Sequence, residues 1–464
     1  MDKARRLVGG SGRFIDDSEP PGLLYGAFLR ADEAHAELLS VEVDAARAMP
    51  GVLLVLTGDD LRAEGVGPIP TTMEVEGRDG RAFYCPPRHA LAVGRVRHVG
   101  ESIALIVAST LAQAKDAAEA ISLRTRPLGY VTDIRNADTE QAPLIWDEAP
   151  GNLCLDYELG DAQAVEGAFA EASHVTKITL ANNRIAVCSM EPRGAIASFE
   201  HGRYTLRTGT QGTYAVREVL AKAVLNVPPA QLRVLTDDVG GAFGMKTPVY
   251  PEYVALLAAA RQLGRSIKWI NSRAESFLSD NAGRDSSIEG QLALNAEGSI
   301  LALRVRTRAN MGAYLTHVGP YIPTVQTGRS LASVYRTPAI HMRVRCFFTN
   351  TVPVGPYRGA GRPEANLIVE RLIEKAAAET GWDPVELRRR NLIPPTAMPY
   401  TTPTGVTYDS GDFPKILEQL LDRAEWHDFV WRVAESRARG RLRGGGLACY
   451  LEATGGMVPE RADI

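Results

Sequence analysis

Residues 358–391 read RGAGRPEANLIVERLIEKAAAETGWDPVELRRRN, a glycine-punctuated loop followed by two helix patterns. Pro363 suits the first turn of a helix, and apolar residues then recur at i, i+3 and i+4 spacing until Gly381. Pro384 opens the second helix. The pattern places Arg358 and its glycines just before a helix N-terminus, where anionic oxygens are stabilised.

A second glycine-rich loop, residues 238–246, reads DVGGAFGMK and precedes a helix that Pro251 opens and Gly264 ends. Because glycine has no Cβ, successive N–H groups of such loops can approach an anion. Two such loops, more than a hundred residues apart, indicate one large anionic cofactor gripped from two sides. The loop is not the P-loop of nucleotide triphosphatases, since Met245 stands where that loop has glycine before lysine.

Composition excludes several classes of protein. The 464 residues carry a net charge of -3 without a basic run, so nothing favours nucleic-acid binding. No apolar run approaches the roughly 20 residues of a membrane span, and no apolar signal core follows the N-terminus. We therefore expect a cytoplasmic protein with no membrane partner, long enough for about three domains.

The cysteines and histidines indicate no metal site. The five cysteines are dispersed without a Cys-x-x-Cys pair, and the eight histidines include no His-Glu-x-x-His motif. An iron–sulfur cluster or structural zinc within this chain is therefore not expected. If the protein carries out redox chemistry, its electron carriers belong to other chains.

The alternation of strand and helix patterns predicts a mixed α/β or α+β fold in three units. Residues 1–135 combine short strands with a helix that Thr110 caps; on that helix we expect Leu111, Ala114, Ala118 and Ile121 to share a face. A linker running over the surface is predicted for 136–152, a second unit for 153–400, and the start of a third for 410–464.

Three polar groups have two readings each. Gln211, between Thr210 and Gly212, is either a turn-capping amide or a hydrogen-bond donor to a cofactor oxygen. Glu191 with Arg193, and Arg284 with Asp285, are either substrate-binding groups or paired charges. Paired or exposed charges are the commoner case.

With these motifs the chain resembles, over nearly its whole length, the large molybdenum-cofactor subunit of the xanthine oxidase and aldehyde oxidase family, which includes carbon monoxide dehydrogenase-like members. Besides the two loops, the resemblance is carried by GRFIDD at 12–17, YGAFLR at 25–30, PGV at 50–52, VGE at 99–101, NR at 183–184, MEPRG at 190–194, TQG at 210–212 and ER at 370–371. It implies an α/β hammerhead domain over 1–135, a first molybdopterin-binding domain over 153–400 and the beginning of a second over 410–464.

The resemblance also implies the site. Gln211 matches the glutamine that hydrogen-bonds an apical metal oxygen, and no side chain ligates the metal. The implied cofactor-binding residues are Gln211, Gly240, Gly241, Ala242, Phe243, Gly244, Arg358, Gly359 and Ala360. Phe243, Tyr357 and Ala360 would form one wall of the substrate pocket.

Such proteins oxidise or hydroxylate an aldehyde or N-heterocycle with oxygen derived from water. The resemblance implies a molybdenum-molybdopterin cofactor, in its cytosine dinucleotide form, and electron transfer to separate 2Fe-2S and FAD subunits. Three positions depart from the family pattern. Ala242 replaces a third glycine, Gly359 stands where carbon monoxide-oxidising members have a cysteine, and Thr247 stands where purine hydroxylases have a glutamate. The last two disfavour carbon monoxide and xanthine as substrates.

The family's large subunits run several hundred residues further and carry the general base there, in a Gly-x-Gly-Glu setting. We do not assign that role to Glu452. We expect a split large subunit, as in nicotinate dehydrogenase-like enzymes, that is inactive without a second polypeptide supplying the rest of the domain. The alternative is a non-catalytic truncated paralogue that acts as a binding or assembly module.

Overall fold

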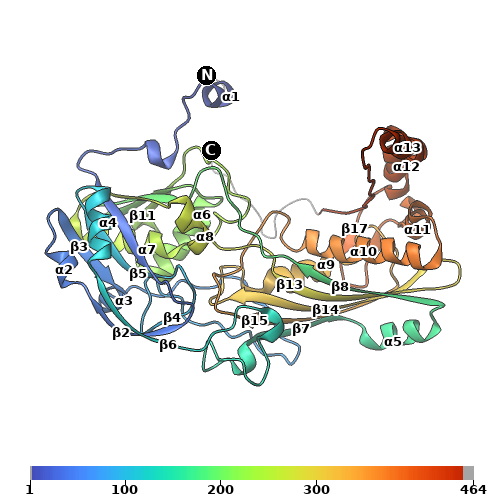
Figure 1. Ribbon diagram of the computed structural model, residues 1–464, viewed down its shortest axis with the longest axis horizontal. Helices are drawn as coiled ribbons and strands as arrows, with labels where there is room; N and C mark the ends of the chain where they lie inside the picture. The colour runs from blue at the N-terminus through green and yellow to red at the C-terminus, as the bar shows by residue number, and fades with distance from the viewer. Residues whose placement is uncertain (1–2, 453–464) are drawn as a thin grey trace.

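The structure is a computed structural model that describes residues 3–452. Two large sheets dominate it, and the predicted mixed α/β class is confirmed (Figure 1). No helix among the described residues combines the length and apolar character needed to cross a membrane.

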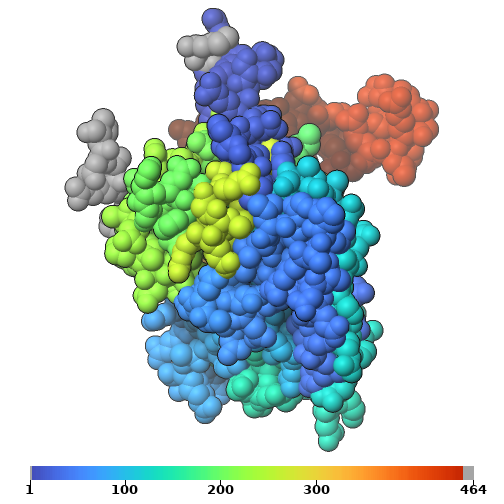
Figure 2. Space-filling model, turned by 90° about the vertical axis from the view of Figure 1, so that its left-hand side faces the viewer, coloured from blue at the N-terminus to red at the C-terminus, as the bar shows by residue number. Residues whose placement is uncertain are grey.

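The first large sheet has seven strands in the order β11-β10-β9-β12-β1-β5-β3. It joins distant parts of the sequence, because β1 pairs in parallel with β12 through Leu24 and Ile267. Its strands are β1 (Leu24–Arg30), β3 (Val52–Thr57), β5 (Ser102–Ala108), β9 (Gly194–Glu200), β10 (Arg203–Thr208), β11 (Leu232–Leu235) and β12 (Ile267–Ile270). Viewed from the left-hand side of Figure 1, the blue early chain lies against the green and yellow middle of the chain (Figure 2).

Helices cover both faces of this sheet. Strand β5, SIALIVA, is buried at every position, as expected of a strand enclosed on both faces. Leu105 and Val107 share a core with α7 (Pro251–Leu263), whereas Ala104 and Ile106 share one with α4 (Leu111–Glu119).

The second large sheet has five strands in the order β7-β15-β14-β13-β8, all antiparallel except the β14–β15 pair. Its strands are β7 (Leu153–Gly160), β8 (His174–Asn182), β13 (Ser286–Leu294), β14 (Ile300–Gly312) and β15 (Ala339–Phe348). Helix α10 (Arg362–Thr380) buries Ile368, Leu372 and Ile373 in the largest core cluster, which also contains Ile288 and Val305 of this sheet.

Shorter elements complete the fold. A three-stranded sheet contains β4 (Arg95–Val96), β2 (Ala36–Glu42) and β6 (Ser122–Pro127), and a two-stranded one contains β16 (Tyr400–Thr401) and β17 (Thr407–Tyr408). The remaining α-helices are α1 (Lys3–Val8), α2 (Asp44–Arg47), α3 (Gly58–Ala63), α5 (Ala162–Glu171), α6 (Thr213–Val219), α8 (Arg273–Ser279), α9 (Thr327–Ser330), α11 (Pro384–Asn391), α12 (Phe413–Arg423) and α13 (Phe429–Ala438). Helices α12 and α13 stand out from the rest of the molecule (Figure 1).

The predicted helix ends are confirmed. Thr110 caps α4 by accepting a hydrogen bond from the backbone N of Gln113 at 3.2 Å. Gly264 and Gly381 follow α7 and α10 in the left-handed conformation, with φ of 60° and 77°. The predicted face of α4 is wrong in part, since Leu111 is exposed and Ala117 is buried.

The segment 136–152, predicted as a surface linker, contains no α-helix or strand, but several of its side chains are buried. Ile145, Trp146 and Ala149 are buried in the core of the second sheet. Asn152 is also buried and donates hydrogen bonds to the carbonyls of Ala137 and Pro143 at 2.9 and 3.0 Å. Because the segment 136–152 is rich in polar residues, its sequence did not indicate these few buried side chains, which hold the segment in place.

Candidate functional site

The two glycine loops lie side by side. The backbone N of Arg358 donates a hydrogen bond to the carbonyl of Phe243 at 2.9 Å. A Cβ on Gly244 would come within 2.8 Å of the carbonyl oxygen of Pro356, so only glycine permits this approach. The tertiary structure thus brings into contact two segments whose only connection in the sequence is that both are glycine-rich loops.

Both loops contain left-handed backbone. Gly241, Gly244 and Gly359 have φ of 98°, 96° and 92°. Phe243 and Ala360 have φ of 53° and 42°, although their Cβ atoms make this conformation unfavourable. Residues held in such conformations cluster at ligand-binding sites.

The first loop presents free donors. The N–H groups of Gly241, Ala242 and Phe243 make no hydrogen bond with any other residue of the described chain. Three consecutive N–H groups of this kind can form an anion-binding nest.

Gln211 connects the loop to the end of β10. Its Oε1 accepts hydrogen bonds from the backbone N of Gly244 at 2.7 Å and from Thr247 Oγ1 at 3.2 Å. The side-chain amide nitrogen finds no acceptor between residues 3 and 452. Gln211 therefore caps the turn through its side-chain oxygen. Its NH₂ group is left free to donate to a ligand.

The predicted pocket wall is only partly assembled within this chain. Tyr357 lines a small cavity of about 30 Å³, together with Arg284 and Glu364. Phe243 and Ala360 do not line it. The Arg358 side chain is exposed and has no ion-pair partner in the part of the chain that the structure describes.

Arg193 is a paired charge, as the commoner reading held. Its side chain is fully buried and bonds Glu252 at 2.9 Å and Asp280 at 2.5 Å. Its guanidinium also lies 3.7 Å from the ring centroid of Tyr250. The cluster joins Glu252 of α7 to Asp280 at the end of α8, and Tyr250 donates a hydrogen bond to the carbonyl of Met245 in the first loop at 2.8 Å.

Arg284 and Asp285 are also paired. Arg284 bonds Glu364 at 2.8 Å, and Asp285 bonds Arg184 at 3.0 Å. Both residues have positive φ, at 63° and 73°. Arg284 also donates to the carbonyl of Arg358 at 2.8 Å, so it belongs to the support of the second loop.

Lys246 is a site residue whose role the sequence did not reveal. It is buried and donates to the Glu191 carboxylate at 2.8 Å, instead of facing a phosphate as a P-loop lysine would. Burial lowers the pKa of Lys246, against the opposing effect of the Glu191 carboxylate. The rejection of the P-loop reading agrees with this geometry.

The first loop is also tied to the N-terminal segment, a contact that no sequence signal indicated. Arg6 of α1 forms two hydrogen bonds with Asp238, at 2.6 and 2.7 Å, across 232 positions of sequence. The hydrogen bonds from Arg6 lower the pKa of the Asp238 carboxyl to about 2.

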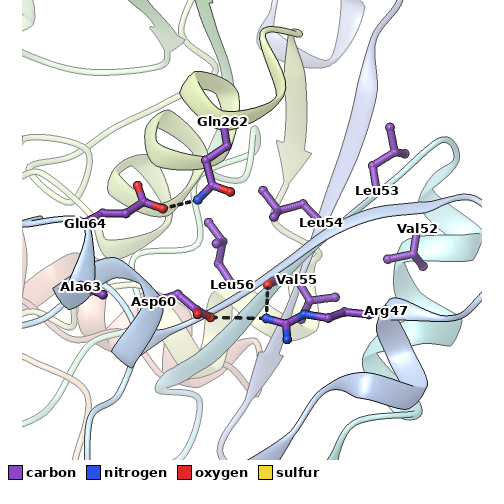
Figure 3. Close-up of a pocket in the computed structure, with 10 residues that line it drawn as sticks. All are labelled: Arg47, Val52, Leu53, Leu54, Val55, Leu56, Asp60, Ala63, Glu64 and Gln262. Atoms are coloured by element: carbon purple, nitrogen blue, oxygen red, sulfur yellow. Dashed lines mark hydrogen bonds and ion pairs between the residues drawn. The ribbon is translucent and has the colours of Figure 1, made fainter.

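A separate pocket of about 480 Å³ lies beside the edge strand β3 (Figure 3). None of its lining residues belongs to either glycine loop. Arg47 reaches across it, donating to the carbonyl of Val55 at 3.3 Å and pairing with Asp60 at 3.8 Å. The arginine thereby occupies part of the open strand edge, a common protection against unwanted strand pairing.

Among residues 3–452 no group of three or more His, Cys, Asp and Glu side chains is placed to hold a metal ion. Glu452 is half exposed and forms an ion pair with Arg362 at 3.2 Å.

Comparison with known proteins gives this geometry a family. Residues 145–392 match the family described as the molybdopterin cofactor-binding domain. Residues 9–129 match that of the a/b hammerhead domain of aldehyde oxidase and xanthine dehydrogenase. The predicted fold, a hammerhead domain followed by a molybdopterin-binding domain, is confirmed, while the precise domain boundaries stay a prediction.

Individual relatives agree. The gamma subunit of the 6-hydroxypseudooxynicotine dehydrogenase complex of Paenarthrobacter nicotinovorans is 33% identical over 457 residues, which cover 97% of this chain and 57% of that protein. Quinoline 2-oxidoreductase from Pseudomonas putida 86 superposes with a TM-score of 0.88 at 34% identity, over 94% of this chain and 55% of that one. The large molybdopterin subunit of nicotinate dehydrogenase from Eubacterium barkeri is 25% identical over 393 residues, which cover 84% of this chain and 87% of that subunit.

The chain thus spans little more than half the length of the first two relatives. Within that span, the paired loops and the two matched domains lead to one conclusion. The chain belongs to the family of molybdenum hydroxylase large subunits that includes the xanthine dehydrogenases and aldehyde oxidases.

Proposed function

We propose that this chain is the molybdopterin-binding part of a hydroxylase that oxidises an aldehyde or an N-heterocycle with oxygen derived from water. Electrons would leave through 2Fe-2S and FAD centres on other subunits. The observation that carries the proposal is the backbone hydrogen bond from Arg358 to Phe243, which makes one continuous surface of the two loops.

The residues present fit the cofactor. The loops approach each other so closely that a Cβ on Gly244 has no room, and three successive N–H groups beside that contact are free. We assign these donors, the Gln211 amide and the Arg358 guanidinium to the anionic pterin group, in its cytosine dinucleotide form. When bound, the cofactor supplies the metal centre for two-electron oxidation, and this chain orients it through those donors.

The substrate class follows from the wall that this chain supplies. Phe243 in the first loop is 42% exposed, and Tyr357 in the second loop lies against the first, since a Cβ on Gly244 would be 3.2 Å from the Tyr357 Cα. Aromatic faces of this kind suit flat heterocycles and unsaturated aldehydes. Gly359 offers no thiol, so carbon monoxide is not the proposed substrate.

A second polypeptide is proposed to complete the enzyme and to supply the general base. Support comes from residues 447–452, where packed Leu447, Cys449 and Leu451 alternate with exposed residues, as in a strand. In residues 442–452 the only main-chain hydrogen bond is from Ser333 Oγ to the carbonyl of Cys449. A groove of about 640 Å³ is lined by this segment and by α10. An added strand would pair the segment and fill the groove.

The test is co-expression with the neighbouring reading frame, followed by purification through a tag on this chain. We expect a stable complex that contains molybdenum and pterin and oxidises N-heterocycles or aldehydes. A stable monomer that never acquires molybdenum would reject the proposal in favour of the non-catalytic assembly module.

Replacing Gln211 by Ala should lower turnover of that complex by about 10²-fold, the usual effect of losing one aligned donor at a reacting oxygen. Assembly should persist, because Gly244 and Thr247 lose only one shared acceptor. Steady-state kinetics and size-exclusion chromatography measure the two effects. Gln262→Ala, an exposed glutamine on α7, is the control and should change neither. Loss of assembly with Gln211→Ala would leave turn capping as its only role.

A further inference from the structure

Glu191 ties down both ends of the first loop. Its Oε2 accepts hydrogen bonds from the backbone N of Gly240 and from Lys246 Nζ, both at 2.8 Å. Lys246 Nζ also donates to the main-chain carbonyl of Glu191 at 2.9 Å. Lys246 is 1% exposed and Glu191 15% exposed, so solvent screens this ion pair little.

The second loop is held in the same manner by a different pair. Glu364 Oε2 accepts from the backbone N of Gly361 at 2.7 Å, and its Oε1 bonds Arg284 at 2.8 Å. Arg284 reaches back to the loop through its hydrogen bond to the carbonyl of Arg358. Their side chains are 9% and 10% exposed.

The two pairs share a geometry that a simple stabilising ion pair does not require. Each carboxylate accepts a hydrogen bond from the backbone N–H of a glycine in its loop. Each cation donates a hydrogen bond to a backbone carbonyl in or next to the site. The N–H groups between Gly240 and Gly244 are thereby left unpaired and held in one orientation. Buried ion pairs contribute little net stability compared with apolar replacements, because desolvation offsets their attraction. Their geometry points to a role in shaping the loops.

We propose that the pairs Glu191–Lys246 and Arg284–Glu364 are positioning residues that preset the two loops for the cofactor. The inference rests on the proposed function for the identity of the ligand. Its structural part, that the pairs hold the loops in the chain itself, is independent of that function.

The test is amide hydrogen exchange on the isolated chain, with Glu191→Gln as the first variant. Glutamine keeps the shape of the side chain, but its neutral oxygen accepts weaker hydrogen bonds from Gly240 N and Lys246 Nζ than the carboxylate does. We expect exchange in a peptide covering 238–247 to accelerate by about tenfold, since a hydrogen bond to a charged group is lost. Exchange in 286–294, within β13, should stay unchanged. Glu364→Gln should have the corresponding effect on 356–362.

The matched control is Glu370→Gln. Glu370 also forms a buried ion pair, with Arg388 at 2.9 Å, but it bonds the Tyr335 hydroxyl and no loop amide. This variant should lower the melting temperature while leaving exchange in 238–247 unchanged. Equal loop exchange in Glu191→Gln and Glu370→Gln would overturn the proposal.

A double variant separates positioning from stability. In Glu191→Gln with Lys246→Met no unpaired buried charge remains, so we expect the melting temperature to recover relative to Glu191→Gln alone. Loop exchange should stay fast, and pterin bound per chain in the purified complex should stay several-fold below that of the wild type. Recovery of slow exchange together with stability would refute positioning. If the wild-type complex holds no pterin, the proposed function fails, and the exchange experiment still decides whether the pairs hold the loops.

Discussion

Replacing Arg193 by Met is expected to destabilise the protein by about 3–5 kcal/mol, the usual cost of removing one partner from a buried charge cluster. The side chain is fully buried between Glu252 and Asp280, so its loss leaves two carboxylates without their shared cation. Urea-induced unfolding followed by tryptophan fluorescence measures the change. Arg389→Met is the control, since its partners Glu386 and Glu418 are exposed and such pairs contribute about 1 kcal/mol or less. Equal losses in both variants would contradict this account.

The same variant should alter the pH dependence of stability. Burial raises the pKa of Glu252, but Arg193 and Arg30 outweigh that effect and lower it to about 2. A carboxyl whose pKa is lower in the folded state stabilises the protein above its unfolded pKa of about 4.3. That contribution is lost as pH falls towards 2. Without Arg193 the effect of burial on the pKa of Glu252 dominates. The difference in unfolding free energy between the variant and the wild type should therefore shrink as the pH falls from about 4.3 towards 2.

Replacing Gly244 by Ala should abolish most activity of the assembled enzyme, by more than about 10²-fold, because a displacement of about 1 Å at a reacting centre has effects of this size. The added methyl would meet the carbonyl oxygen of Pro356 at 2.8 Å, and φ is 96°. The loops must therefore move apart, and the hydrogen bond from the backbone N of Arg358 to the carbonyl of Phe243 is lost. Turnover and the pterin content of the purified complex are the measurements.

The control for Gly244 is Gly381→Ala. Gly381 also has positive φ, at 77°, but an added Cβ would find no atom within 4 Å. Its replacement should cost about 1 kcal/mol of backbone strain and leave pterin content unchanged. If both variants lose pterin to the same extent, local strain and not loop contact explains the effect.

Which features could be predicted depends on how far apart the interacting groups lie. The ends of α7 and α10 were predictable because capping and left-handed glycines act within a few residues. The burial of Trp146 in a polar segment was not, since its neighbours belong to distant strands. The prediction that Leu111 lies on the buried face of α4 was wrong for the same reason, because periodicity defines a face of a helix but does not show what covers it.

The candidate site divides in the same way. Both loops were recognisable from glycines that permit positive φ, but the choice between ligand-binding and paired charges could not be made locally. Glu191 meets Lys246 across 55 positions, and Arg284 meets Glu364 across 80. Both partners are ordinary charged residues in sequence, and only burial together makes them support for a loop.

By itself, the sequence determined the family, the class of fold, the helix ends and the presence of two glycine-rich loops. These properties depend on local backbone preferences and on motifs that are read in one stretch. Only the tertiary structure decided that the loops form one surface, and that the early chain shares a sheet with residues 194–270. The tertiary structure also placed the charged residues noted in the sequence in buried ion pairs. The reason is physical: hydrogen bonds and ion pairs depend on distance in space, which a folded chain sets independently of separation along it.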